Sequence, residues 1–281
     1  MQCVVAARTR HPPALVLHLR LDMRRGLVAS ITGALVAFVL EASVARGMGE
    51  ADRLSFAVLT IGDAMGSEET TALERVAWEL EKRTSVTAAP HPTAVAPSDP
   101  GLRRYPLLFV HGAAALPPVE ERALDAVRAH LEAGGLLFID EAGTLSPDAE
   151  DPFDRDVRTL VRRLFPRGQL GRVPADHVLY KAFYLLGEPV GRLVRSTSLE
   201  ALMLDGRIAI LYSRNDVLGA LARDRLGAAA HAMSSGGEGQ REQALRLALN
   251  VVMYALCLDY KADQVHVPFL LKRRRPLSEP F

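Results

Sequence analysis

Residues 105–141 read YPLLFVHGAAALPPVEERALDAVRAHLEAGGLLFIDE, and this stretch decides the fold. The apolar runs at residues 107–110 and 136–139 are typical of strands that are covered on both faces of a parallel sheet. Between the runs, Pro117 and Pro118 suit the first turn of a helix, apolar residues then recur at helical spacing, and two glycines end the helix. A crossover this short joins parallel neighbours, so the sequence predicts an α/β fold.

Polar residues follow each predicted strand at the point where it ends. His111 and Gly112 follow the first apolar run, and Asp140 and Glu141 follow the second. In open parallel sheets, ligands bind beyond the carboxyl ends of the strands, so we expect a pocket there. Because successive side chains of a strand point to opposite faces, Asp140 and Glu141 are expected to point in different directions.

The composition bounds the class of protein. The chain has 281 residues, 49% of them hydrophobic, which suits one sizeable α/β domain, placed here at residues 53–260. Lys plus Arg (34) nearly equals Asp plus Glu (33), so the protein has no overall positive potential that would attract nucleic acid. The basic stretch within residues 261–281 is expected to be a solvated tail. Cys3 and Cys257 argue against a disulfide framework or a structural zinc site.

The N-terminal residues have the organisation of an export signal. Basic residues at 23–25 precede an apolar run at 26–40, and small residues at 43–45 suit cleavage. The run is shorter than the roughly 20 residues of a membrane span. We expect residues 23–46 to be a cleaved signal, with an uncleaved anchor or a buried helix as the alternatives, and residues 1–22 to lie outside the fold. The protein is therefore expected in the periplasm or at the inner membrane, which it would contact only through this segment.

The rest of the chain predicts further helices and strands. The last helix is apolar almost all round and should be buried, and Trp78 should lie at the flank of the core. The predicted strands are at 54–61 and 85–89, and a proline-rich connection follows at 91–100. One predicted helix is capped by Ser67, one starts at Phe153 and one spans 242–258. A hairpin of 199–204 and 208–212 is predicted to turn at Asp205-Gly206.

Several motifs together resemble a bacterial family. They are Tyr105-Pro106-Leu107-Leu108-Phe109 with Gly112, residues 134–140, Phe153-Asp154-Arg155, Leu164-Phe165-Pro166, Asp176-His177-Val178-Leu179-Tyr180, residues 206–213 with Asp216, and Asn250-Val251-Val252. Over residues 54–258 the chain is similar to the domain-of-unknown-function family four-one-five-nine. The resemblance implies a Rossmann-like, mostly parallel sheet with helices on both faces, like flavodoxin, class I glutamine amidotransferases and trehalose-utilisation proteins. It also implies an exported or membrane-anchored protein with von Willebrand-type or AAA-type envelope partners.

An amidotransferase reaction is not expected. That chemistry needs a cysteine on a strained turn beside a histidine. Cys257 falls in a helix that should be buried, where a thiol behaves as a small hydrophobe.

Two hydrolytic arrangements are possible from the residue types. Ser213 ends a predicted strand, and Asp216 and His177 could approach it, although no Gly-x-Ser-x-Gly elbow is present. A metal site could combine His111, Asp140, His177 and Asp216, because imidazole and carboxylate groups suit zinc or manganese.

Two hypotheses of different classes remain, and neither names a cofactor. One is a non-catalytic ligand- or protein-binding domain of the cell envelope; the other is a metal-assisted or serine hydrolase that uses His177, Asp140, Ser213 and Asp216. Convergence of these four around an open pocket would favour the hydrolase, and scattered, internally bonded side chains would favour the binding domain. The structural alternatives are helix or turn capping by Asp140, Asp154 and Asp176 and a backbone bond from His177. The candidate pocket residues are His111, Gly112, Asp140, Glu141, Asp154, Arg155, Asp176, His177, Tyr180, Ser213 and Asp216.

Overall fold

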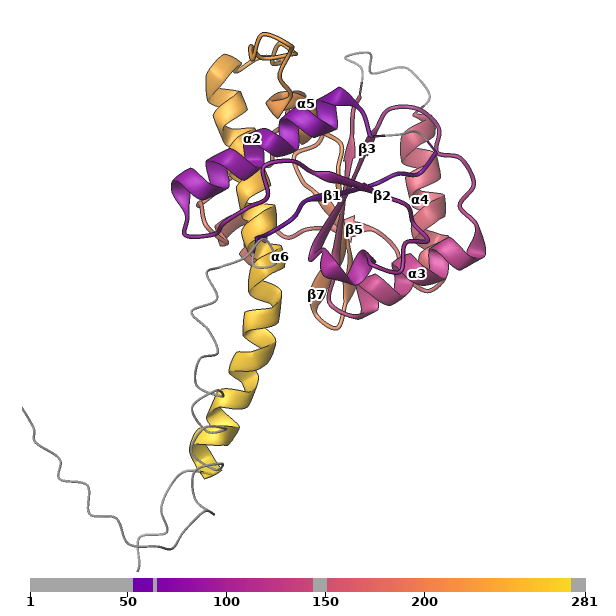
Figure 1. Ribbon diagram of the computed structural model, residues 1–281, viewed down its shortest axis with the longest axis vertical. Helices are drawn as coiled ribbons and strands as arrows, with labels where there is room; N and C mark the ends of the chain where they lie inside the picture. The colour runs from indigo at the N-terminus through magenta and orange to yellow at the C-terminus, as the bar shows by residue number, and fades with distance from the viewer. Residues whose placement is uncertain (1–52, 63–64, 144–150, 274–281) are drawn as a thin grey trace, which may run out of the picture. The chain divides into compact units, whose positions relative to one another are not determined.

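The computed structural model describes residues 53–62, 65–143 and 151–273, with side chains as far as residue 257 (Figure 1). All of them belong to one unit, Gly49–Phe281. A second unit, Met1–Met48, lies outside the described residues, and so do the predicted N-terminal extension and signal segment.

A seven-stranded sheet forms the centre of the domain, in the order β2-β1-β3-β4-β7-β6-β5. The first five strands in that order are parallel, β6 is antiparallel to β7, and β5 is antiparallel to β6. The predicted Rossmann-like, mostly parallel sheet is therefore confirmed. The strands are β1 (Ala57–Leu59), β2 (Thr93–Val95), β3 (Leu107–Gly112), β4 (Leu136–Glu141), β5 (Gly171–Arg172), β6 (Glu200–Leu204) and β7 (Arg207–Ser213).

The stretch quoted first forms β3, α3 (Glu121–Glu132) and β4, as predicted. The two strands pair in register, with Phe109 opposite Phe138 and His111 opposite Asp140. Gly134 has φ +114, the left-handed conformation expected after the helix. The prolines were placed wrongly: α3 begins three residues after Pro118, because Glu120 is the N-cap, and the prolines lie in the preceding loop.

The second strand was also placed wrongly. Residues 85–89 contribute only an isolated bridge between Leu54 and Ala88, and β2 forms later, within the segment predicted to be a connection. Pro92 does not prevent this, because β2 is at the edge of the sheet, where a missing amide costs no ladder bond. The amide of Thr93, the next residue, donates to the Phe56 carbonyl at 2.9 Å.

Helices cover both faces of the sheet (Figure 1). α2 (Ser67–Arg83), α5 (Val217–Leu221) and α6 (Gly237–Arg273) pack together on one face, and α3 and α4 (Pro152–Leu164) pack on the other. The short 3₁₀ turns η2 (Leu102–Arg104) and η3 (Val178–Lys181) complete the described elements. Among these helices, none combines the length and the apolarity that crossing a membrane requires.

The predicted hairpin and last helix are present, with differences at the ends. Asp205 and Gly206 have φ +49 and +79, which is the type I′ turn expected between β6 and β7. α6 begins before residue 242 and runs to Arg273, into the residues predicted to be a C-terminal tail. Trp78 is 50% exposed beneath the cations of Arg75 and Lys82, so its predicted place at the core flank was wrong.

Candidate functional site

A pocket of about 220 Å³ lies where the strand order reverses direction, at the carboxyl ends of β1 and β3. After β1 the chain crosses to β2 on one side, and after β3 it crosses to β4 on the other side, so the two connections diverge at this point. Ligands of open α/β sheets bind at such points. The described lining residues are Val58, Leu59, Thr60, Ile61, Met65, Gly66, Glu69, Val110, His111, Gly112, Ala113, Ala114, Ala115, Leu116, Pro117 and Phe153.

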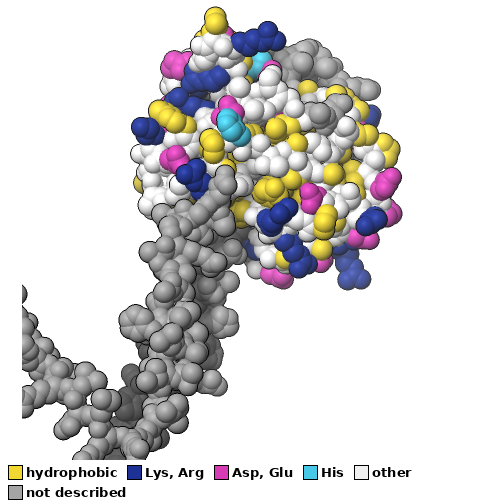
Figure 2. All heavy atoms as spheres, in the orientation of Figure 1, with side chains coloured by type: hydrophobic (Ala, Val, Ile, Leu, Met, Phe, Trp, Pro, Cys, Tyr) yellow, Lys and Arg dark blue, Asp and Glu magenta, His cyan; other side chains and the backbone are white. Residues whose placement is uncertain are grey.

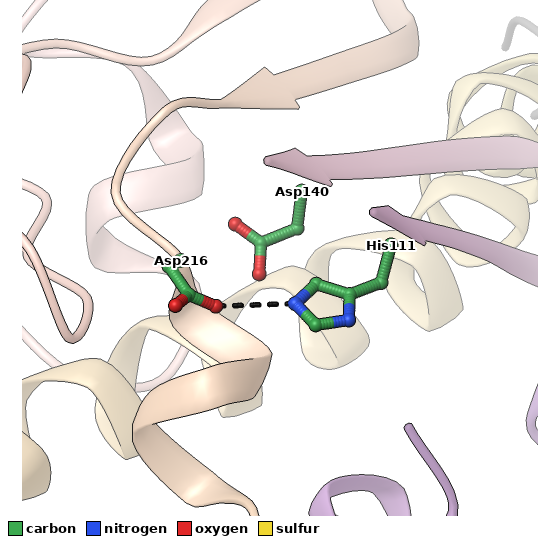
Figure 3. A group of neighbouring side chains, drawn as sticks. All are labelled: His111, Asp140 and Asp216. Carbon is green, nitrogen blue, oxygen red and sulfur yellow. Dashed lines mark hydrogen bonds and ion pairs between the residues drawn. The ribbon is translucent and has the colours of Figure 1, made fainter. Parts of the chain in front are cut away.

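His111 joins this pocket to a buried polar cluster. Its side chain is only 2% exposed and is held at both ring nitrogens. Nδ1 lies 2.9 Å from Glu69 Oε1, and Nε2 lies 3.1 Å from Asp216 Oδ1 (Figure 3). Glu69 uses its other oxygen to accept from the Gly66 amide at the start of α2, so the helix start and the end of β3 are tied together.

Asp216 is the N-cap of α5 and adopts φ +57, which is rare for a residue with a side chain. Its Oδ1 accepts from the Gly219 amide at 2.9 Å, and its Oδ2 is paired with the guanidinium of Arg192. A Cβ on Gly219 would lie 2.3 Å from Asp216 Oδ1, so only glycine permits this approach. The sequence prediction that Asp216 belongs to the site is consistent with this position, but its role in capping α5 was not predicted.

Asp140 lies at the end of β4 with no exposed surface. Its Oδ2 accepts from the Leu218 amide at 2.7 Å, so the predicted bond to a helix start is present, although the helix is α5 rather than the next segment of the chain. Its Oδ1 is buried and has no hydrogen-bond partner among the described residues. In Figure 3 the carboxylate points towards the contact between His111 and Asp216.

Burial and charge act in opposite senses on the imidazole of this cluster. Burial lowers the pKa of His111, but the bonds to Asp216 and Glu69 and the charge of Asp140 outweigh it and raise that pKa to about 10. Burial raises the pKa of Asp140, and the charge of Asp216 raises it further. For Asp216, burial is outweighed by His111 and Arg192, so its pKa is lowered. The cluster is therefore a compact set of coupled charges beneath the pocket.

Glu141 points away from Asp140, as predicted, and belongs to a different network. Its side chain is paired with Arg195, accepts from Arg214 at 3.1 Å and accepts from the Tyr212 hydroxyl at 2.9 Å. Burial and a bond with Asp151 raise the pKa of Glu141. This network links β4 to the loop before β6 and to the end of β7.

Ser213 lies beside the cluster, opposite Asp140 in the paired strands β4 and β7, but no hydrogen bond joins its hydroxyl to the cluster among the described residues, and His177 lies elsewhere. Ser213 is buried, and its Oγ accepts from the amide of Asn215 in its own turn. His177 caps η3 through a bond from the Leu179 amide and packs 5.7 Å from the Tyr254 ring.

The position of Tyr254 places His177 at the opposite end of the sheet. The Tyr254 hydroxyl accepts from the Ile208 amide at the beginning of β7, whereas Asp216 follows the end of that strand. Ser213 is five steps along the strand from Ile208, which corresponds to roughly 17 Å.

The remaining predicted residues lie outside the cluster. Asp154 is in the first turn of α4 and pairs with Arg158, whereas Arg155 is exposed and bonds its neighbour Asp156. Asp176 is exposed, and Tyr180 is buried with its hydroxyl accepting from Leu199 at 3.4 Å. Gly112 lines the pocket, and a Cβ there would meet Phe153 at 3.1 Å.

Two site residues were missed from the sequence. Glu69 had a local signal, because Gly66 followed three residues later by a glutamate is a helix-start pattern, but the start was assigned to Ser67, which is the first helical residue rather than the cap. Arg192 had no signal, because only the tertiary structure brings its loop beside Asp216.

One face of the domain carries charges of both signs. On the face shown in Figure 2, described basic and acidic side chains are interspersed with apolar ones. This distribution agrees with the near balance of charge in the sequence.

Comparison with known proteins gives one family match. The family model described as "Domain of unknown function (DUF4159)" matches residues 55–256, which include every residue of the pocket and of the cluster beneath it. No curated protein matches the chain.

Proposed function

The chain belongs to the DUF4159 family, and we propose that its domain is a non-catalytic binding domain that holds a small polar ligand in the pocket at the ends of β1 and β3. The observation that carries the proposal is the lining of this pocket. Among its described residues there is neither a serine nor a cysteine, and its one imidazole is already bonded at both nitrogens.

The arrangement of the hydrolase candidates supports the same proposal. A hydrolase built on His177, Asp140, Ser213 and Asp216 needs these side chains to converge at an open pocket. Ser213 is opposite Asp140 in the sheet, but its Oγ accepts from its own turn. His177 packs on Tyr254 near the other end of β7, so the four side chains do not converge. Cys257 is half-buried on α6 and does not line the pocket, so no described cysteine is placed to act there as the nucleophile that an amidotransferase needs.

The size and rim of the pocket indicate what it holds. A volume of about 220 Å³ is below the roughly 300 Å³ at which drug-sized sites begin, so the ligand is small. The rim carries the exposed residues Ala113, Ala114 and Ala115, whose short side chains leave the backbone accessible to a polar ligand. Glu69, 16% exposed at its side chain, adds a carboxylate to the wall.

A pocket-filling variant tests the proposal. Saturation-transfer NMR of the full chain with a mixture of small amines, carboxylic acids, sugars and nucleosides is expected to detect one chemical class. Ala114→Phe should remove that signal, and Ala228→Phe, on an exposed loop elsewhere, should leave it unchanged. The same samples are then assayed with ester, phosphoester and glycoside substrates. Turnover that Ala114→Phe abolishes would show that the domain is an enzyme, and unchanged binding in Ala114→Phe would show that the pocket is not the site.

The location that we propose is the cell envelope, with the domain in the periplasm or anchored at the inner membrane. Support comes from the basic and apolar pattern of residues 23–46. The resemblance to the family also supports it, because that resemblance implies envelope partners of the von Willebrand type or the AAA type. Fractionation of cells that express the full chain tests it. Recovery in the cytoplasm with an intact N-terminus would contradict the proposal.

A further inference from the structure

We propose that His111, Asp140 and Asp216 form a binding site for a divalent first-row transition metal, zinc or manganese, beneath the pocket. One ligand atom from each residue lies within 4.8 Å of the other two. The second observation is independent of this clustering: Asp140 Oδ1, on a side chain with no exposed surface, has no hydrogen-bond partner among the described residues. A buried carboxylate oxygen is costly to leave unpaired, and a cation would satisfy it.

The three residues are held on rigid, separate parts of the fold. His111 and Asp140 are opposite each other in the paired strands β3 and β4, and Asp216 caps α5. Zinc with ligands at about 2.1 Å in tetrahedral geometry needs ligand atoms about 3.4 Å apart. His111 Nε2 and Asp216 Oδ1 are already 3.1 Å apart, so small side-chain rotations would complete the site.

Glu69 is in place to orient the imidazole. Histidine ligands commonly donate their second ring N–H to a carboxylate, which fixes the tautomer and makes the ligating nitrogen more basic. Glu69 Oε1 lies 2.9 Å from Nδ1, which leaves Nε2 as the nitrogen that faces the two aspartates.

The charges around the site suit a dication. The carboxylates of Asp140, Asp216 and Glu69 surround His111, and Arg192 is the cation paired with Asp216. An ion bound to Nε2 would displace the proton that this nitrogen shares with Asp216 and release it to solvent. His111 is then neutral, and a divalent ion and this guanidinium cancel the three negative charges, so the buried cluster would be electrically neutral.

The donor set indicates the class of metal. One imidazole and two carboxylates match zinc, manganese and iron, whereas calcium takes six to eight oxygen ligands and magnesium usually keeps several waters in an octahedral shell. A set of three protein ligands also leaves at least one position for another ligand. Of the three ligands, His111 lines the pocket, so we infer that an ion would reach the site from the pocket.

Metal analysis of the full chain tests this site. The protein is stripped with a chelator and dialysed against zinc or manganese at neutral pH, and the bound metal is measured by mass spectrometry and its affinity by calorimetry. We expect about one equivalent of metal and a rise in Tm when the ion is added. Asp140→Asn should lower the affinity at least tenfold, and because asparagine keeps an oxygen for the Leu218 amide, this variant should fold.

Two further variants and two controls distinguish this site from surface binding. Asp216→Asn should also lower the affinity at least tenfold, and Glu69→Gln should lower it by about tenfold, as expected for a residue that orients a ligand. The controls His91→Gln and Asp176→Asn, at an exposed histidine and an exposed aspartate, should leave it unchanged. Less than a tenth of an equivalent of bound metal, or equal affinity in folded Asp140→Asn, would overturn the inference.

The outcome does not depend on the small-ligand proposal. Ala114→Phe is expected to abolish ligand binding in the pocket but to leave the equilibrium amount of bound metal unchanged, because residue 114 is not in the cluster. Failure of either proposal is therefore visible separately.

Discussion

Protonation of His130 should make this domain lose stability as the pH falls. His130 lies on α3, is 2% exposed, and packs so closely over Gly135 that a Cβ there would lie 2.1 Å from Nε2. That nitrogen has no hydrogen-bond partner among the described residues. Burial, and after it the positive charges of Arg207 and Arg103, lower the pKa of His130 from 6.5 to about 4.

The size of the effect follows from the two pKa values. Because the folded pKa is depressed, the unfolded chain takes up the proton first, so stability is complete above pH 6.5 and is lost as the pH falls towards 4. The fall of the pKa from 6.5 to about 4 corresponds to a loss of about 3 kcal/mol of unfolding free energy once the pH is well below 4. At pH 5 the loss is about 2 kcal/mol.

The assay is urea unfolding at pH 7 and pH 5, comparing the chain with His130→Leu and with His91→Gln. Leucine cannot take up a proton, so the loss of unfolding free energy between the two pH values should be smaller in His130→Leu by about 2 kcal/mol. This comparison cancels every other titrating group, and His91, which is exposed, serves as the control. If His130→Leu loses as much stability as the unmodified chain, then His130 is not the buried neutral imidazole described above.

Two further stability predictions concern α6 and the hairpin. Asn250 is fully buried; its side chain accepts from the amides of Phe183 and Tyr184 and donates to the carbonyls of Leu179 and Tyr184. Asn250→Leu leaves these groups unpaired, so it should lower the free energy of unfolding, measured by urea titration, by about 3–5 kcal/mol. A loss below 1 kcal/mol would show that water replaces the side chain. Gly206 has φ +79, and the space where a Cβ would lie is open. Gly206→Val should therefore lower the free energy of unfolding by about 1–3 kcal/mol through backbone strain alone, and Gly206→Ala should lower it less. Equal Tm values for the three proteins would contradict this prediction.

The strands and helices that could be predicted are those with a local signal. The apolar runs around Phe109 and Phe138 formed neighbouring strands because a strand buried on both faces must be apolar along its length. The turn at Asp205-Gly206 has the chemistry of a tight hairpin. The edge strand β2 was missed because three residues between prolines carry no such signal.

The candidate site was predicted in part for the same reason. His111 and Asp140 are each the last residue but one of a strand, Asp216 follows the end of β7, and the carboxyl ends of parallel strands meet at one edge of a sheet. Ser213 also ends a strand, but its hydroxyl bonds its own turn. His177 is an imidazole, as the predicted site required, but it lies near the other end of the strands. The sequence around His177 does not indicate at which end of the sheet its loop packs.

The sequence by itself determined the α/β class, the parallel pair at the centre and the polar residues at the strand ends, because these depend on the order of apolar and polar residues along a few turns or strands. Only the tertiary structure decided which of those polar residues meet. The bonds from His111 to Glu69 and Asp216 span 42 and 105 residues, and Arg192 reaches Asp216 from a separate loop. Such contacts depend on how whole helices, strands and loops pack against each other, and a local sequence pattern does not predict that packing.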